Sequence, residues 1–173
     1  MSLKIPSAKL IQSAVCKTNV RHRPNPSLFV FPGLYSQPFY DSSLFPFKSQ
    51  IQSKFTEVKD EYLKLKKQGP QSDYSTKQSC ETEHKLHSGE WDWNSYILKG
   101  VRQSFFASNC PNTVELLESL NSPKLMVDTP FSFSFFSTLH KNSSISSHYG
   151  PCNLRIRCHL PIIVPEGKIC RMF

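Results

Sequence analysis

A run of alternating phenylalanine and serine residues constrains the fold of this chain more than any other feature. Residues 131–139 read Phe-Ser-Phe-Ser-Phe-Phe-Ser-Thr-Leu. Successive side chains of a β-strand point to opposite faces, so the alternation predicts a strand with aromatic rings on one face and hydroxyl groups on the other. Such a strand buries one face and presents its serines, among them Ser137, to solvent or to a cavity.

Three further segments have the composition of strands. Residues 91–98 combine large apolar and polar side chains before Gly100, and residues 153–160 and 162–164 lie near the end of the chain. Within 153–160 the apolar side chains are Leu154, Ile156, Cys158 and Leu160, and the alternating cationic ones are Arg155, Arg157 and His159. This cationic face binds a carboxylate if it lines a cavity and only aids solubility if it faces water. Spacing alone favours the solvated face, because antiparallel sheets often expose one side.

Two segments show the periodicity of helices. Residues 47–67 carry apolar side chains at three- and four-residue steps, with Lys and Glu on the opposite face, and Gly69-Pro70 ends the pattern. A second helix is predicted with Pro111 in its first turn and Asn109 or Cys110 as its cap. Its predicted buried side chains are Val114, Leu117 and Leu120. The whole pattern predicts a mainly β chain with flanking helices, an α+β fold.

Composition and charge argue against several classes of protein. The 173 residues match one domain in size, and 13 Phe residues argue against global disorder. No apolar run approaches the roughly 20 residues of a membrane-spanning helix. Much of the +8 charge falls in residues 1–27, which are basic, Ser-rich and free of acids. They resemble a transit peptide or a disordered tail, and we interpret them as an unstructured leader. No basic stripe interleaved with aromatics follows, so a nucleic-acid partner is not expected.

The cysteines and the loop histidines do not form a recognisable metal or disulfide pattern. The six cysteines are scattered with no Cys-x-x-Cys pair, and we expect most to be free or packed thiols. Residues 69–90 are polar and predict a surface loop. Within it, His84 and His87 lie beside Cys80 and Glu83. No second ligand cluster accompanies them, so we interpret them as solvated loop residues.

One dense motif lies near the end of the chain. Residues 148–160 read His-Tyr-Gly-Pro-Cys-Asn-Leu-Arg-Ile-Arg-Cys-His-Leu. This segment resembles the aspartyl/asparaginyl β-hydroxylase family, which reads H-x-G-P-T-N-x-R-x-R-x-H-L at this point and has Thr where this chain has Cys152. Shorter echoes lie upstream in the same order, at residues 31–34, 93–100 and 110–118. The resemblance covers residues 28–173, and several motifs in order are more specific than one.

The resemblance implies a double-stranded β-helix, a jelly-roll or cupin-like oxygenase fold. Family members use Fe(II), O₂ and 2-oxoglutarate to hydroxylate the β-carbon of Asp or Asn in a protein or peptide partner. By this resemblance His148 binds iron, while Arg157 and His159 contact 2-oxoglutarate. Ser137 matches the family's hydroxyl donor to the cosubstrate, and Trp93 matches the wall of that site.

Two departures set this chain apart from the family pattern. Before His148 the family has P-G-T-H-I-x-P-H, whereas residues 141–148 read Lys-Asn-Ser-Ser-Ile-Ser-Ser-His, so we expect a less rigid loop. Family members also continue past the position of Gly167 with strands that carry a second iron-binding His and an Arg. We therefore expect a C-terminally truncated domain, a jelly roll without its last strands, with weak iron binding and impaired turnover.

Three hypotheses for function remain open. The first is the incomplete hydroxylase-family domain, and the second is a non-catalytic jelly-roll scaffold that binds an anionic peptide or small carboxylate through Arg155, Arg157 and His159. The third and weakest is a basic nucleic-acid binder, whose affinity would depend on salt. Missing strands leave a sheet edge open, which predicts self-association through residues 162–164. The resemblance also allows a parent protein anchored in the endoplasmic reticulum or another membrane, so the location stays open.

Overall fold

The chain forms two compact units in a computed structural model. The described residues are 31, 33–34, 37–69, 71–74, 87–121, 124–150 and 152–165. The first unit comprises residues 1–40 and 148–160, and the second comprises residues 41–147 and 161–173. The expected leader, the loop residues Cys80, Glu83 and His84, and the chain after residue 165 lie outside the described residues.

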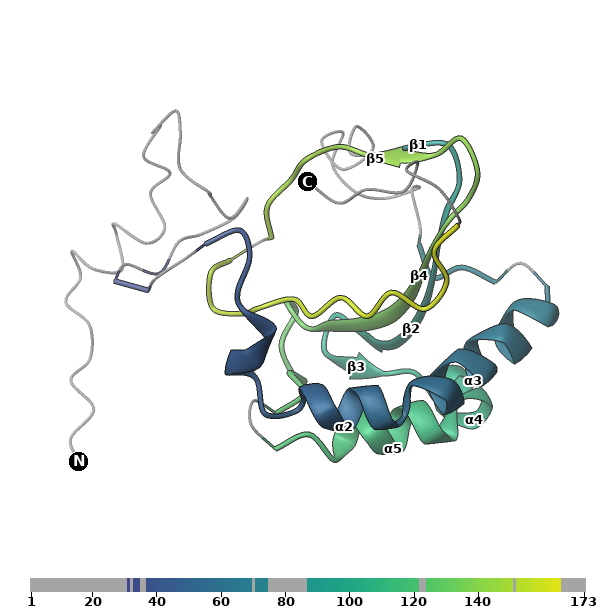
Figure 1. Cartoon of the computed structure of the whole chain (residues 1–173). Helices are drawn as coiled ribbons and strands as arrows, with labels where there is room; N and C mark the ends of the chain where they lie inside the picture. Colours follow the sequence, from purple (N-terminus) through teal and green to yellow (C-terminus); the bar gives the residue numbers. More distant parts are fainter. Residues whose placement is uncertain are drawn as a thin grey trace. The chain divides into compact units, whose positions relative to one another are not determined.

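The second unit is built on a three-stranded antiparallel sheet (Figure 1). Strand β2 (Trp91–Leu98) lies in the middle, between β3 (Val101–Arg102) and β4 (Phe133–Leu139). A separate two-stranded sheet joins β1 (His87–Ser88) to β5 (Ser144–Ile145). The strand predicted for residues 91–98 is confirmed, and β4 confirms most of the one predicted for residues 131–139.

The turn between β2 and β3 depends on Gly100. Lys99 and Gly100 have φ angles of 50° and 87°, the combination that a two-residue hairpin turn of type I′ requires. A Cβ atom on Gly100 would lie 2.6 Å from both the backbone nitrogen and the backbone oxygen of Thr129. The turn therefore needs glycine both for its φ angle and for the close approach of the chain at Thr129.

Helices gather on one side of this sheet (Figure 1). They are α2 (Lys48–Ser53), α3 (Phe55–Lys67), α4 (Ser104–Asn109) and α5 (Pro111–Glu118), and the short helix η1 (Ser42–Leu44) precedes α2 in the chain. The single helix predicted for residues 47–67 is thus two helices, which are separated at Lys54 because its φ of −100° and ψ of 7° leave the helical range. The second predicted helix is confirmed, with Cys110 before its first residue Pro111. The sequence pattern missed α4.

Aromatic side chains fill the space between the sheet and the helices. Tyr62 of α3 and Phe106 of α4 both contact Phe136 of β4, with ring centroids 5.2 Å and 5.1 Å apart. Phe106 also contacts Tyr96 of β2 at 5.8 Å. All four side chains are buried, and burying large aromatic groups is a main source of hydrophobic stabilisation.

The buried face of α5 differs from the predicted one. Thr113 and Leu116 are buried, whereas Val114 and Leu117 are only half-buried. Leu120, which follows the helix, is buried as predicted. The prediction is wrong for two of its three residues because it counted only apolar side chains, and a polar contact orients the first turn of α5.

That polar contact comes from Glu61 of α3, which is only 4% exposed. One carboxylate oxygen accepts hydrogen bonds from the backbone and side-chain nitrogens of Asn112, both at 2.8 Å. The other accepts from the Thr113 backbone N–H at 2.8 Å and from its hydroxyl at 2.6 Å. A carboxylate at a helix N-terminus satisfies N–H groups that have no partner inside the helix. The Lys and Glu face predicted for this region is therefore not uniformly exposed.

The two faces of β4 also depart from prediction. Phe133, Phe135 and Ser137 share one face by the period of two, while Phe136 and Thr138 share the face toward the helices. The prediction of aromatics on one face and hydroxyls on the other is wrong, because the Phe135-Phe136 pair shifts the alternation by one residue. As a result, Ser137 stands on an aromatic face.

Residues 153–160 of the first unit and 162–164 of the second form no strand, contrary to prediction. Leu154 and Ile156, two of the apolar residues that the prediction placed on one face, are 48% and 56% exposed. Alternation favours an extended chain, but a strand also needs a neighbour to bond its N–H and C=O groups. The structure places no paired strand beside these residues in the described part of the chain. Asn153 anchors the segment instead, since its side-chain amide donates to the Phe31 carbonyl at 2.8 Å and accepts from the Phe31 N–H at 2.7 Å.

The described residues form a mixed α+β structure with small antiparallel sheets. The predicted α+β class is confirmed, whereas a closed jelly roll is not present in this part of the chain. Among the described helices, none has the length and apolar character needed to cross a membrane.

Candidate functional site

Two of the predicted cosubstrate residues face each other in the second unit. Trp93 of β2 and Ser137 of β4 are cross-strand partners. Ser137 is exposed, and its Oγ accepts a hydrogen bond from Trp91 Nε1 at 2.8 Å. This bond uses a lone pair only, so the Ser137 hydroxyl keeps its proton for another acceptor. The arrangement suits the hydroxyl donor that the sequence predicts.

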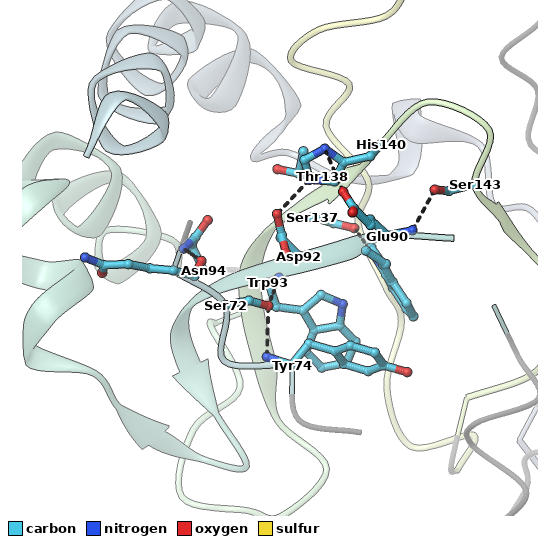
Figure 2. A network of polar contacts seen from close by, with 12 residues as sticks. Ser72, Tyr74, Glu90, Asp92, Trp93, Asn94, Ser137, Thr138, His140 and Ser143 are labelled. Atoms are coloured by element: carbon cyan, nitrogen blue, oxygen red, sulfur yellow. Dashed lines mark hydrogen bonds and ion pairs between the residues drawn. The ribbon is translucent and has the colours of Figure 1, made fainter. Parts of the chain in front are cut away.

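Trp93 is the centre of a group of aromatic rings on the same face of the sheet. Its ring stacks on Phe135, with centroids 4.3 Å apart and an interplanar angle of 16°, and it contacts Trp91 at 5.1 Å. It also contacts Tyr74 at 4.9 Å (Figure 2). The Trp93 Nε1 atom is buried and has no hydrogen-bond partner among the described residues. An unsatisfied buried donor costs about 1–3 kcal/mol. A carboxylate oxygen at this position would remove that cost.

The first unit carries the other predicted site residues. We call them, with Arg155, the cation group: His148, Arg155, Arg157 and His159. Desolvation, and then the charge of Arg155, lower the pKa of Arg157 to about 10, although its side chain still reaches solvent. Desolvation also lowers the pKa of His159, and the charges of Arg157 and His148 add to this effect. The predicted residues of this unit are therefore close enough to act on one another.

The cation group has no acidic residue in its own segment. Residues 148–165 contain neither Asp nor Glu. Placing like charges together is unfavourable, and partial removal of water strengthens their repulsion. A bound anion relieves that repulsion, and a carboxylate accepts the paired N–H donors of a guanidinium. These residues therefore fit the carboxylate groups of 2-oxoglutarate, the implied cosubstrate.

The set of candidate iron ligands is less complete than the set of residues for 2-oxoglutarate. His148, matched to an iron-binding His of the family, lies in the exposed segment after β5. The described residues contain no group of three or more His, Cys, Asp or Glu side chains that could hold a metal ion. Non-haem Fe(II) oxygenases are usually built on two histidines and one carboxylate, so one imidazole is a weak site. This part of the chain fits 2-oxoglutarate, and it does not present a full set of iron ligands.

A polar network on the other face of β2 escaped the sequence reasoning. His140 follows β4, and its Nε2 atom lies 2.7 Å from Asp92 Oδ2 (Figure 2). Asp92, Asn94 and His140 border a hollow of about 180 Å³ at the end of α3. Asp92 pairs with Thr138, and His140 lies two residues after Thr138, so the period of two places His140 on the same face; the strand pairing itself comes from the tertiary structure.

The described cysteines are free thiols, as expected. Cys110 and Cys152 are buried and Cys158 is exposed. Burial, with a contribution from the charge of Glu61, raises the pKa of Cys110 to about 12. His87, predicted to be a solvated loop residue, lies instead in β1, and its ring packs against that of Tyr74 at 5.2 Å. The prediction for His87 was wrong because this residue pairs with Ile145 of β5.

Comparisons with known proteins show which family this chain resembles. The chain is 38% identical over 80 residues to aspartate beta-hydroxylase domain-containing protein 2 of Rattus norvegicus, which covers 46% of this chain and 23% of that protein. It is 29% identical over 135 residues to the ornithine lipid ester-linked acyl 2-hydroxylase of Rhizobium tropici, covering 77% of this chain and 44% of that protein. The chain thus spans less than half the length of these relatives.

A family model extends the likeness over most of the chain. The model described as Aspartyl/Asparaginyl beta-hydroxylase matches residues 52–173. The match includes both strands of the Trp93–Ser137 pair and the whole cation group. This chain belongs to the aspartyl/asparaginyl beta-hydroxylase family.

Proposed function

We propose that this chain is a 2-oxoglutarate-binding domain of a Fe(II)- and 2-oxoglutarate-dependent hydroxylase that acts on Asp or Asn side chains of a protein or peptide. The observation that carries the proposal is the concentration of Arg155, Arg157 and His159 within five residues of the segment that the family match includes. Because the family consists of such hydroxylases, 2-oxoglutarate is the anion that best matches this group.

Each side chain has a defined part in this proposal. Arg157 holds a carboxylate through charge-assisted hydrogen bonds, and His159 donates a further one. Ser137 donates its hydroxyl proton, and Trp93 provides an apolar wall with a free N–H at its edge. Bound iron supplies the activation of O₂ in this chemistry, and His148 is the ligand that this chain would contribute.

The substrate has a second candidate. One relative is named an acyl 2-hydroxylase of an ornithine lipid, and it matches 77% of this chain. An acyl lipid is therefore the alternative to an Asp or Asn side chain. Supplying an Asp- or Asn-containing peptide and an acyl lipid in parallel assays, with succinate release as the readout, distinguishes the two.

A non-catalytic scaffold is the second candidate function. The observation that favours it is that the described residues hold no group of metal-ligating side chains. Such a scaffold binds a small carboxylate or an acidic peptide through Arg155, Arg157 and His159 without turning it over. Iron-dependent release of succinate from 2-oxoglutarate by this chain would exclude the scaffold, whereas binding without release would support it.

Calorimetric titration with 2-oxoglutarate tests the proposed binding site. Arg157→Ala removes a charged hydrogen-bond donor, which is typically worth about 1.5–3 kcal/mol, so we expect affinity to fall about 10- to 100-fold. Lys64→Ala removes an exposed cation from α3 and is the matched control, with affinity unchanged. If R157A binds 2-oxoglutarate as tightly as the wild-type chain, the assignment of Arg157 is wrong.

The substitution Trp93→Phe distinguishes an effect on 2-oxoglutarate binding from an effect on folding. Phenylalanine keeps a ring against Phe135 and removes the buried N–H that has no partner. We therefore expect thermal stability to stay near that of the wild-type chain while the affinity for 2-oxoglutarate falls. Unchanged affinity in this variant would show that Trp93 Nε1 does not contact the cosubstrate.

A further inference from the structure

Three aromatic rings contact the side chain of Trp91 at the start of β2. The Trp91 ring lies 5.0 Å from that of Tyr74, at an interplanar angle of 46°. The ring of Trp93 lies 5.1 Å away at 77°, and the ring of His87 lies 5.7 Å away at 62°. Tilted and edge-to-face pairs of rings are favourable at these distances. The neighbouring rings therefore limit the orientations that the Trp91 indole can adopt.

Hydrogen bonds hold these neighbouring rings in turn. The Asp73 backbone N–H donates to the Trp93 carbonyl at 2.8 Å, which fixes the chain next to Tyr74 against β2. Figure 2 shows the Tyr74 ring beside that of Trp93. The Tyr74 hydroxyl also lies 3.2 Å from His87 Nδ1. The surroundings of Trp91 are thus held by hydrogen bonds as well as by ring packing.

The Trp91 indole reaches Ser137 on the neighbouring strand. Trp91 pairs with Leu139 and Trp93 pairs with Ser137, so Trp91 and Ser137 are diagonal neighbours, a spacing that aromatic side chains can bridge. Trp91 Nε1 donates to Ser137 Oγ at 2.8 Å. An indole has an N–H donor and no acceptor. The direction of this bond is therefore fixed, because the indole can only donate and the hydroxyl oxygen must accept.

Accepting this bond leaves the Ser137 hydroxyl with a proton to donate. A serine hydroxyl has one O–H donor, and its proton rotates toward an available acceptor. The Trp91 nitrogen is no acceptor, and no residue in the described part of the chain takes this proton. Ser137 is exposed, so the proton is available to a ligand. A hydroxyl that accepts one hydrogen bond also donates more strongly, because bonds in a chain polarise one another.

The adjacent hydroxyl on β4 does not have this fixed direction. Thr138 lies on the opposite face of the strand, and its Oγ1 atom is 3.0 Å from the Tyr62 hydroxyl. Either of these two hydroxyl groups can donate to the other. Thr138 is therefore a matched comparison for Ser137, since both carry a hydroxyl on the same strand and Ser137 alone of the two is bonded to an indole.

We propose that Trp91 is a positioning residue for 2-oxoglutarate, because it orients the Ser137 hydroxyl so that the proton is donated to a carboxylate oxygen of the cosubstrate. Trp91 acts through Ser137 and does not touch the ligand. A carboxylate oxygen accepts from a hydroxyl, whereas a ligand group without an acceptor finds no partner there. The inference rests on the proposed function, because the ligand is the 2-oxoglutarate of that proposal.

Exchange of the indole protons with solvent tests the bond between Trp91 and Ser137 without any ligand. The chain has 2 Trp residues, so its ¹⁵N–¹H spectrum contains one indole signal from each, and Trp91→Phe identifies the signal of Trp91. We expect this proton to exchange about fivefold faster in Ser137→Ala, because no hydrogen bond to the hydroxyl has to open. Thr138→Val removes the adjacent hydroxyl and should leave the exchange unchanged. Equal exchange in S137A and the wild-type chain overturns the bond, and the positioning role with it.

A double-mutant cycle on the affinity for 2-oxoglutarate tests the positioning role. We expect calorimetric titration to show about tenfold weaker binding in S137A, which loses the donor, and about threefold weaker binding in W91F, which leaves the donor unaligned. The double variant should bind as weakly as S137A alone, because Trp91 acts through Ser137. T138V should bind as tightly as the wild-type chain. Losses that add in the double variant overturn the positioning role, because Trp91 then acts independently of Ser137.

A second replacement at position 91 keeps the packing of the ring. Benzothienylalanine retains the double ring and has sulfur in place of the N–H, so we expect a wild-type Tm with the same loss of about threefold in affinity as in W91F. Wild-type affinity in this variant overturns the positioning role alone. A wild-type chain that binds no 2-oxoglutarate overturns the proposed function and the positioning role together, although the exchange measurement still shows whether the hydrogen bond exists.

Discussion

Replacing Glu61 with glutamine tests how α3 packs on α5. The carboxylate of Glu61 accepts four hydrogen bonds, two from Asn112 and two from Thr113. Two of the donors are backbone N–H groups in the first turn of α5, which have no partner inside the helix. Glutamine has nearly the same shape, but one oxygen becomes an NH₂ group that faces those donors.

The expected loss of stability follows from these contacts. Hydrogen bonds to a charged group contribute about 1.5–3 kcal/mol each, and leaving a buried donor unsatisfied costs about 1–3 kcal/mol. Favourable interaction with the helix dipole adds up to about 2 kcal/mol in partly buried sites. Some donors will find water, so we expect E61Q to lose about 3 kcal/mol of unfolding free energy. For a chain of this size, such a loss lowers the Tm by about 6–12 °C.

The pH dependence gives an independent check. Desolvation raises the pKa of Glu61, but the hydrogen bonds from Thr113 and Asn112 together outweigh it and hold the pKa below its ordinary value of 4.5. The carboxylate therefore contributes fully above pH 4.5, and this contribution is lost as the pH falls through the lowered pKa of the folded state. Between those values the wild-type chain should lose stability more steeply than E61Q.

Chemical denaturation at several pH values measures both effects. Glu57→Gln is the matched control, because Glu57 lies on the same helix and forms an exposed ion pair with Lys54. We expect little change in its Tm. If E61Q is as stable as E57Q and shows the same acid profile as the wild-type chain, the Glu61 contacts do not join α3 to α5 as described.

Three further outcomes are expected. Gly100→Ala should lower stability by about 2 kcal/mol in thermal melts, because alanine strains the turn; an unchanged Tm would contradict the turn geometry. In the native chain at pH 8, iodoacetamide should modify exposed Cys158 before buried Cys110, whose pKa of about 12 keeps it protonated, and mass spectrometry would show any reverse order. We also expect the chain to self-associate through residues 162–164, where Ile163 is 54% exposed, and Ile163→Lys should lower the mass measured by light scattering. A monomeric wild-type chain would refute that expectation.

Local patterns predicted the elements whose signal lies within one segment. Alternation located β2 and most of β4, and Pro111 marked the first residue of α5. The same patterns missed α4, a six-residue helix too short to show a period. They also predicted strands at residues 153–160 and 162–164, where the structure has none. A strand is a property of two paired segments, and alternation in one of them does not supply the other.

The candidate site, too, was only partly predictable from the sequence. The motif at residues 148–160 and the two upstream positions predicted which side chains bind 2-oxoglutarate, and the structure makes Trp93 and Ser137 cross-strand partners. The roles of these residues stay predictions until binding is measured. The contact between His140 and Asp92 spans 48 positions in the chain, so no local pattern contained it.

By itself, the sequence determined β2, most of β4 and the start of α5, the excess of cations near residue 157 and the family to which the chain belongs. These depend on side-chain identity and spacing along a single segment. Only the tertiary structure decided that Glu61 is buried, that the Trp93 N–H has no partner among the described residues and that His140 contacts Asp92. Burial and hydrogen bonding of a polar group depend on which distant segments surround it, and the same residue type is exposed or buried accordingly.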